Sequence, residues 1–185
     1  MSKIIPALQS RCTRFRFAPL KKDDMERRLV YVVDKEGISE RVTADGIRAI
    51  LTLAQGDMRK VLNVLQATAA GFPAVDAANV YACTGNPTPA DVSVVLQSLL
   101  ADDIRTAHTV LLDLMRRGFA LIDVLVAIGR TLLTLDFPND ALRFIMGRLA
   151  DIEHRLAFGT SDKIQGAALV AAFSQVRALI EAARK

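Results

Sequence analysis

Two arginines in distinct local settings are the side chains of this sequence best suited to chemistry on phosphate. Arg11 lies in the segment Gln9-Ser10-Arg11-Cys12, and Arg59 lies in Gly56-Asp57-Met58-Arg59. A guanidinium stays charged and offers a planar set of donors that matches phosphate oxygens. No GxxxxGK[ST] loop, which would cradle nucleotide phosphates with backbone N–H groups, occurs in the 185 residues. We therefore expect part of an enzyme, with arginines that sense a phosphate held elsewhere, and no activity from this chain alone.

The surroundings of Arg11 favour a side chain that reaches a neighbour. Pro6 fits the first turn of a short helix that ends near Ser10, and Thr13-Arg14-Phe15-Arg16-Phe17 alternates with the period of a half-buried strand. A lone strand cannot bury a face, so we expect its sheet to be completed by sequence that is not present here. Arg11 then has two interpretations. It is an arginine finger that stabilises phosphoryl transfer in a neighbour, or it is an ordinary surface arginine.

Arg59 falls in the first turn of a helix predicted to begin at Asp57. An aspartate is favourable at that end of a helix, whereas a cation is slightly unfavourable, so helix stability does not explain why an arginine stands there. Its functional interpretation is a contact with the γ-phosphate of a nucleotide. The alternative is a solvated arginine paired with Asp57.

The elements that must position these arginines are predicted to be helical from Pro19 onward. Thr43 is a plausible N-cap in the first half, and Thr84-Gly85-Asn86-Pro87-Thr88-Pro89 marks a boundary because two prolines and a glycine cannot continue a helix. The apolar periodicity predicts a small helical bundle before this boundary and about five helices after it. The fold class is therefore all-α, with a short helix and strand at the start.

Two expectations concern burial in the second half. The stretch 121–135 is apolar on nearly all sides of a helix, which predicts burial on all sides. A later stripe is expected to stay partly available to a partner, because this half has more apolar helix surface than a five-helix domain can hide; its members are Leu169, Phe173, Val176 and Ile180.

Composition agrees with helix-on-helix packing in a soluble intracellular protein. Hydrophobic residues make up 51% of the chain and aromatic residues 5%, with no Trp. The net charge of +4 is scattered and does not by itself indicate a nucleic-acid partner. Cys12 and Cys83 are far apart, no Cys/His spacing makes a metal site, and no stretch approaches the roughly 18 apolar residues that span a membrane.

Three segments together resemble the small subunits of the replication factor C clamp loaders, most closely the type numbered 3 or 5. Residues 4–17 are similar to the family's Ser-Arg-Cys segment, and Gly56-Asp57-Met58-Arg59-Lys60-Val61-Leu62-Asn63 resembles its sensor 2 segment. Tyr81-Ala82-Cys83-Thr84-Gly85 resembles the junction between its lid and its collar. The resemblance spans nearly the whole chain and is a matter of helix pattern after residue 90.

The resemblance implies a division into three parts. Residues 1–17 would be a remnant of the AAA+ ATPase core, 18–85 the lid domain with sensor 2, and 88–185 the collar that joins subunits into a heteropentameric ring. Arg11 would be the arginine finger that acts on the neighbouring subunit, and Arg59 the sensor 2 arginine for the ATP of its own subunit.

The same resemblance implies cofactors and partners. ATP and Mg²⁺ would bind in the full-length complex and not to this chain alone, and no metal ligand is expected here. Other replication factor C subunits would bind through the collar, and the sliding clamp and primer–template DNA would bind through the whole complex, in the nucleus. The alternative function is a free-standing all-helical scaffold or adaptor that joins a ring assembly without ATPase function.

Overall fold

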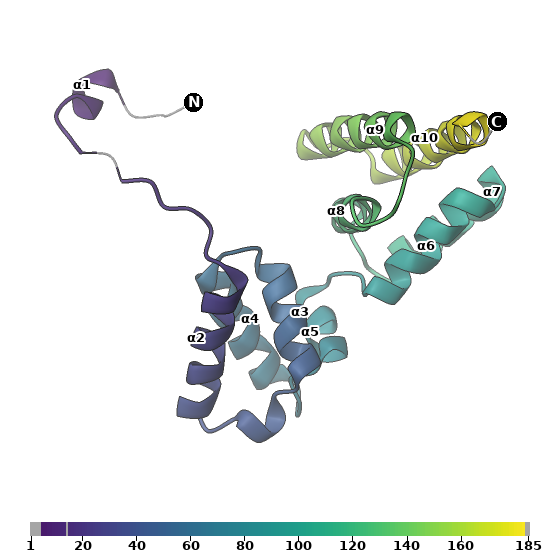
Figure 1. The fold of residues 1–185 in the computed structure, drawn as a ribbon. Helices are drawn as coiled ribbons and strands as arrows, with labels where there is room; N and C mark the ends of the chain where they lie inside the picture. Colours follow the sequence, from purple (N-terminus) through teal and green to yellow (C-terminus); the bar gives the residue numbers. More distant parts are fainter. Residues whose placement is uncertain (1–4, 14, 184–185) are drawn as a thin grey trace. The chain divides into compact units, whose positions relative to one another are not determined.

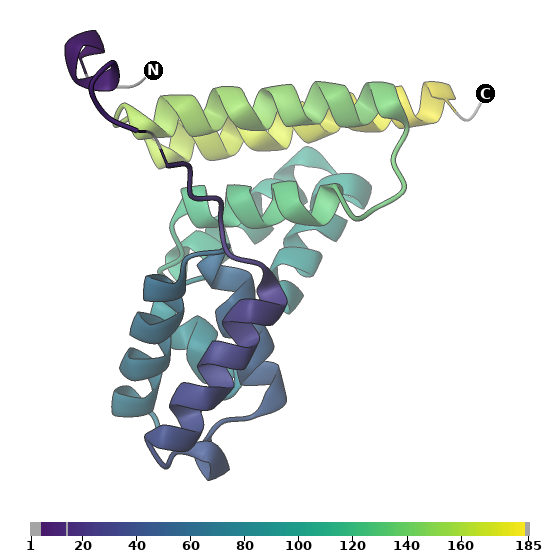
Figure 2. The same ribbon diagram turned by 60° about the vertical axis from the view of Figure 1, so that its left-hand side comes forward.

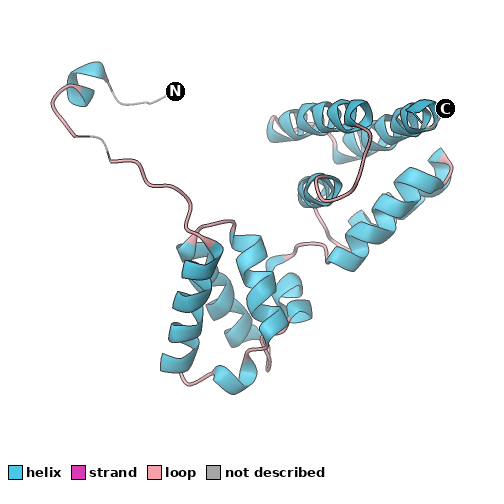
Figure 3. Ribbon diagram, in the orientation of Figure 1, coloured by secondary structure: helices cyan, strands magenta, loops and turns pink. Residues whose placement is uncertain are grey.

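The computed structural model of the chain describes residues 5–13 and 15–183. In that part all regular secondary structure is helical, apart from a single parallel bridge between Val42 and Val75 (Figure 3). The predicted all-α class is thereby confirmed. The chain divides into two compact units, residues 1–83 and 84–185 (Figure 1). Each unit has a hydrophobic core of its own.

The segment before the first bundle begins with the short helix α1, Pro6–Gln9. The strand predicted over residues 13–17 does not form: residues 13 and 15–17 have no regular secondary structure, and Arg14 lies outside the described residues. A strand needs neighbouring backbone groups for its hydrogen bonds, and the described residues offer it no partner strand. Phe15 and Phe17 are accordingly 78% and 94% exposed.

Unit 1 is a small helical bundle whose elements are α2 (Lys22–Lys35), the 3-10 helix η1 (Ser39–Arg41), α3 (Ala44–Ala54), α4 (Met58–Gly71) and α5 (Ala77–Thr84). Helix α2 packs on α3 and α4, and α3 packs on α4 (Figure 2). Apolar side chains recur along α2 at the spacing of one helix face, where Met25, Leu29 and Val33 are buried. Burial of each such side chain stabilises the folded state by roughly 1.5–3 kcal/mol relative to leaving it exposed to water.

Unit 2 is a five-helix domain formed by α6 (Pro89–Ala101), α7 (Ile104–Arg116), α8 (Leu121–Leu132), α9 (Asn139–Ala157) and α10 (Asp162–Ala183). Helices α9 and α10 lie side by side as a hairpin, and α8 lies beneath them in Figure 2. Helix α10 also packs on α6 and α7. Three helices therefore surround the last one.

That arrangement corrects the expectation for the stripe on α10. Leu169, Phe173 and Val176 are fully buried inside unit 2, and only Ile180 is half-buried. Leu169, Phe173 and Val176 belong to the core of the unit and are not available to a partner, whereas Ile180 lies at its edge. The apolar periodicity of α10 does not reveal how many helices cover it. The prediction of a partner surface at Leu169, Phe173 and Val176 is therefore wrong.

The expectation of a helix over 121–135 buried on all sides is also wrong. Helix α8 ends at Leu132, and Leu133 and Leu135 are 64% and 43% exposed in the connection to α9. After Leu132 the backbone forms tighter, 3-10-type turns, in which the N–H groups of Thr134 and Leu135 donate to carbonyls three residues earlier. Pro138 follows shortly and cannot continue a helix.

Candidate functional site

Arg59 lies exposed in the first turn of α4. The Asp57 carboxylate caps this helix, accepting hydrogen bonds at Oδ1 from the backbone N–H groups of Arg59 (2.8 Å) and Lys60 (3.2 Å). The Asp57 carboxylate therefore binds backbone N–H groups and forms no ion pair with the Arg59 guanidinium. Within the described ranges this guanidinium makes no hydrogen bond or ion pair. It is free to bind an anion that approaches the start of α4.

The turn that leads into α4 has an unusual backbone and a close neighbour. Gln55 and Gly56 both adopt positive φ angles, 53° and 89°. A Cβ atom on Gly56 would lie 2.6 Å from the Cβ of Pro19. The N–H of Leu20 donates to the Gly56 carbonyl at 3.1 Å. The chain that runs from Arg11 towards α2 thus contacts the turn that precedes Arg59, and only glycine fits there.

The far end of α4 is fixed by Arg41, which sequence reasoning missed. Its guanidinium donates to the carbonyls of Ala69 and Phe72, each at 2.7 Å, and to that of Pro73 at 2.9 Å. These carbonyls have no partner within the helix, and a cation is favourable beside them. An exposed arginine 28 to 32 residues away carries no local signal of this role.

Backbone hydrogen bonds also join the segment around Arg41 to Val75, which follows α4. The Val75 N–H donates to the Arg41 carbonyl at 2.7 Å, and the Val75 carbonyl accepts from the Thr43 N–H at 3.1 Å. A Cβ atom on Gly46 would lie 2.1 Å from the Val75 carbonyl oxygen, so the first turn of α3 touches the chain at Val75 directly. We name these contacts between residues 41–46 and 69–77 the Arg41 clamp. The Arg41 clamp fixes α4 relative to α3.

Arg11 lies just after α1. Its backbone N–H donates to the Leu8 carbonyl at 3.2 Å, and the Ser10 hydroxyl donates to the Ala7 carbonyl at 3.1 Å. These bonds end the short helix and leave the Arg11 side chain exposed. No hydrogen bond or ion pair joins it to Arg59 or to any other described residue. Within the described residues, the side chains of Arg11 and Arg59 are thus two separate, exposed cations.

Unit 2 begins with a partly buried carboxylate at the first turn of α6. Asp91 accepts from the Thr88 hydroxyl at 2.6 Å and from Arg117 Nη1 at 2.6 Å, and its side chain is 15% exposed. Thr88 also caps the helix through the Asp91 N–H. Burial acts to raise the pKa of Asp91, but the hydrogen bonds from Thr88 and Arg117 outweigh it and leave the pKa below its ordinary value.

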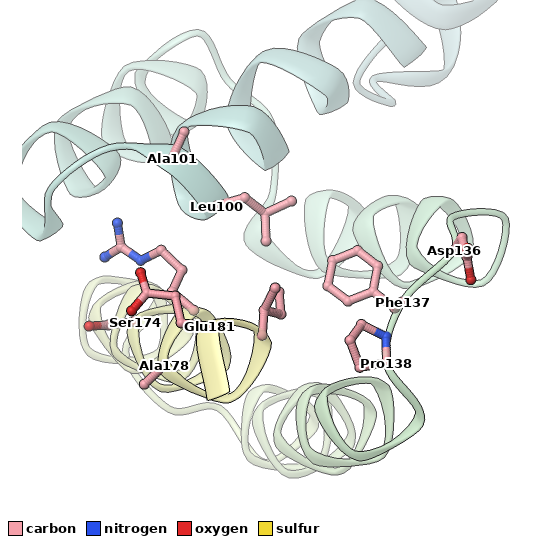
Figure 4. A pocket seen from close by; sticks show the side chains of 10 residues that line it. Leu100, Ala101, Asp136, Phe137, Pro138, Ser174, Ala178 and Glu181 are labelled. Atoms are coloured by element: carbon pink, nitrogen blue, oxygen red, sulfur yellow. The ribbon is translucent and has the colours of Figure 1, made fainter. Parts of the chain in front are cut away.

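Unit 2 also has a cleft of about 920 Å³ between the end of α6, the α8–α9 connection and the last turns of α10 (Figure 4). Leu100, Phe137 and Ile180 contribute its apolar part, and each also packs against the core of the unit. Asp136 and Glu181 line it as exposed acidic groups. Its lining comes from three separate segments, so sequence reasoning did not find it.

Within the described part of the chain, no group of three or more His, Cys, Asp or Glu side chains could hold a metal ion. The helices that are described include none with both the length and the apolar character needed to cross a membrane. Cys12 is exposed and Cys83 half-buried, and both are free thiols.

Comparison with known proteins gives a consistent result. The family model for the replication factor C C-terminal domain matches residues 87–172. Replication factor C subunit 5 of Mus musculus is 44% identical over 183 residues, which are 98% of this chain and 53% of the relative. Replication factor C subunit 3 of Oryza sativa subsp. japonica is 40% identical over 184 residues, 99% of this chain and 50% of the relative. The chain spans about half the length of these relatives.

Proposed function

The chain belongs to the replication factor C family, and on that premise we propose that it is the lid-and-collar part of a clamp-loader small subunit. Residues 18–85 would form the lid and 88–185 the collar that joins related subunits, with 1–17 continuing an AAA+ ATPase core. The complete complex would use ATP to place the sliding clamp on primer–template DNA in the nucleus.

The observation that carries this proposal is the free guanidinium of Arg59 at the start of α4. Asp57 already satisfies the nearest backbone N–H groups, so the arginine side chain is the group left to meet an anion there. A sensor 2 arginine needs this arrangement, because it must contact the γ-phosphate of ATP from the lid. The Arg41 clamp supports the same role by holding α4 as a rigid element.

Arg11 would act on the ATP of the neighbouring subunit. Its side chain is exposed and unpaired within the described residues, as a group that reaches another protein must be. A guanidinium supplied to the transferring phosphate stabilises the charge of the transition state, which accelerates hydrolysis by roughly 10³–10⁵ in known arginine fingers. Both arginines fit phosphate oxygens. Mg²⁺, bound elsewhere in the complex, would neutralise the remaining phosphate charge.

The test compares Arg11→Ala and Arg59→Ala in a complete subunit that carries these residues and is assembled with its partners. Arg11→Ala should slow single-turnover hydrolysis in the adjacent subunit by at least roughly 10³-fold and leave nucleotide affinity of its own subunit unchanged. Arg59→Ala should weaken ATP binding and hydrolysis in its own subunit. Lys60→Ala, which removes the neighbouring exposed cation, is the matched control and should change neither.

Two outcomes would refute the assignments. If Arg11→Ala impaired only the subunit that carries it, Arg11 would not act in trans. If Arg59→Ala behaved like Lys60→Ala, Arg59 would not contact nucleotide. Assembly of the ring, measured by light scattering, should be intact in all three variants because none of these side chains lies in unit 2.

A further inference from the structure

The turn between α3 and α4, residues 54–57, holds two consecutive residues in the left-handed conformation. Gln55 has a φ of 53° and, among the residues that the structure describes, is the only one besides glycine with a positive φ. Gly56 follows with a φ of 89°. Left-handed backbone is uncommon in a residue with a Cβ atom and persists where the surroundings hold it, often at functional sites. We call residues 54–57 the Gly56 turn, and other parts of the chain must hold it in this shape.

The Gly56 turn sets the position of Arg59, the second residue of α4. The first N–H groups of a helix have no carbonyl partner within it, so the first turn of α4 depends on the residues before it. Asp57 makes the connection: its N–H donates to the Ala54 carbonyl at 3.1 Å, and its carboxylate accepts from the Arg59 N–H at 2.8 Å. A change in the shape of the Gly56 turn would therefore move the backbone that carries the Arg59 guanidinium.

Pro19 and Leu20 hold the Gly56 turn from outside the two helices. The Pro19 side chain lies directly against the backbone of Gly56, because a Cβ atom added there would be 2.6 Å from the Pro19 Cβ. The Leu20 N–H donates to the Gly56 carbonyl at 3.1 Å. The Leu20 side chain is 48% exposed, so burial of that side chain does not account for the contact. The segment that enters α2 thus forms one wall of the turn that precedes Arg59.

We propose that Pro19 is a positioning residue for Arg59. Its side chain seats the Gly56 turn, and the turn fixes the first residues of α4, so that the Arg59 backbone is ordered before nucleotide binds. A group that is already ordered loses less conformational freedom on binding, which tightens binding. In this role Pro19 touches no nucleotide and acts only through Arg59. The assignment rests on the proposed contact between Arg59 and the γ-phosphate of ATP.

The test uses the complete subunit assembled with its partners and measures the Kd of ATP–Mg²⁺ at its own site. Pro19→Gly removes the Cβ atom that lies against Gly56 and should raise this Kd at least roughly fivefold, the scale of a contact between neighbouring residues. Pro19→Ala keeps the Cβ atom and should stay within about twofold of wild type. Pro89→Gly, the same exchange at the start of α6, is the matched control for the flexibility that glycine adds, and it should also stay within about twofold.

The combination with Arg59→Ala separates positioning from a general loss of stability. In a subunit that already carries Arg59→Ala, Pro19→Gly should raise the Kd by no more than about twofold, because the side chain through which Pro19 acts is gone. Ring assembly, measured by light scattering, should be intact in every variant. Loss of assembly or wild-type affinity in Pro19→Gly, equal losses in Pro19→Gly and Pro19→Ala, or an undiminished effect without Arg59 would each overturn the positioning role while Arg59 keeps its own. If Arg59→Ala alone leaves the Kd unchanged, the nucleotide role of Arg59 fails, and the role of Pro19 fails with it.

Discussion

At the scale of single residues, Asp91 joins the start of α6 to the end of α7 through one carboxylate. Its two oxygens receive hydrogen bonds from Thr88 and Arg117, and the pKa of Asp91 is lowered in the folded state. A group whose pKa is lower in the folded chain stabilises the native state when it is ionised. The contribution is present above the unfolded value of about 3.9 and is lost as the pH falls through the folded value.

We therefore expect Asp91→Asn to reduce the free energy of unfolding by about 1–2 kcal/mol at pH 7. The difference between wild type and variant should shrink as the pH falls below about 4, because wild type then loses the charge that the variant lacks. Urea denaturation at pH 7 and pH 3 measures both values. Asp113→Asn removes an exposed i,i+3 ion pair with Arg116 and should change stability by less than about 0.5 kcal/mol. An equal effect of the two substitutions would show that the partly buried Asp91 carboxylate stabilises the fold no more than the exposed Asp113.

A second prediction at this scale concerns the effect of a side chain at Gly56 on stability. Its φ of 89° and the distance of 2.6 Å that would separate an added Cβ atom from Pro19 both oppose a side chain. Gly56→Ala should lower the free energy of unfolding by at least about 1 kcal/mol. Gly71→Ala, where nothing lies within 4 Å, should be neutral or stabilising by up to about 1 kcal/mol. Urea denaturation of both variants checks this, and a stable Gly56→Ala protein would mean that Pro19 moves away at no cost.

At the scale of elements, the Arg41 clamp makes a prediction about α4. Arg41→Ala removes three hydrogen bonds to carbonyls near the end of that helix and should lower the free energy of unfolding by about 1–3 kcal/mol. Hydrogen–deuterium exchange should become faster at residues 69–77 and stay unchanged in α6 to α10. Arg48→Ala removes another exposed arginine of the same unit and should leave exchange in this segment as in wild type. Faster exchange throughout the chain would contradict a local role.

Helix boundaries were predictable where a local side chain sets them. The predicted N-cap Thr43 and the helix start at Asp57 are confirmed by hydrogen bonds to backbone N–H groups two or three residues on. Burial was less predictable, because it depends on how many neighbours an element has. Leu133 and Phe173 have similar apolar character, yet one is 64% exposed and the other fully buried.

The candidate site shows the same limit. The sequence placed Arg59 correctly in the first turn of its helix, because the Asp57 cap is local. It could not reveal Arg41, whose acceptors are 28 to 32 residues away, or the cleft between α6, the α8–α9 connection and α10, whose lining comes from three segments. The roles of Arg11 and Arg59 in nucleotide chemistry stay predictions.

At the scale of the whole molecule, we expect the 185-residue chain to bind ATP–Mg²⁺ with a Kd weaker than about 1 mM and to hydrolyse none. Its sequence has no GxxxxGK[ST] loop, and two separate arginines supply far less than a cradle of backbone N–H groups with a bound metal ion. Isothermal titration calorimetry measures the affinity. Micromolar binding by this chain would place the nucleotide site within these residues and overturn the division of labour proposed above.

The Arg41 clamp also constrains when unit 1 can fold as the chain is synthesised. Its partners lie up to 32 residues apart, so a nascent chain that has emerged only as far as residue 65 has α2 and α3 but lacks the Ala69, Phe72 and Pro73 carbonyls that Arg41 binds. Domains generally fold as units during synthesis. The first bundle should therefore become resistant to protease in one step, when Val75 and Ala77 leave the ribosome, and a chaperone would find its apolar faces exposed until then.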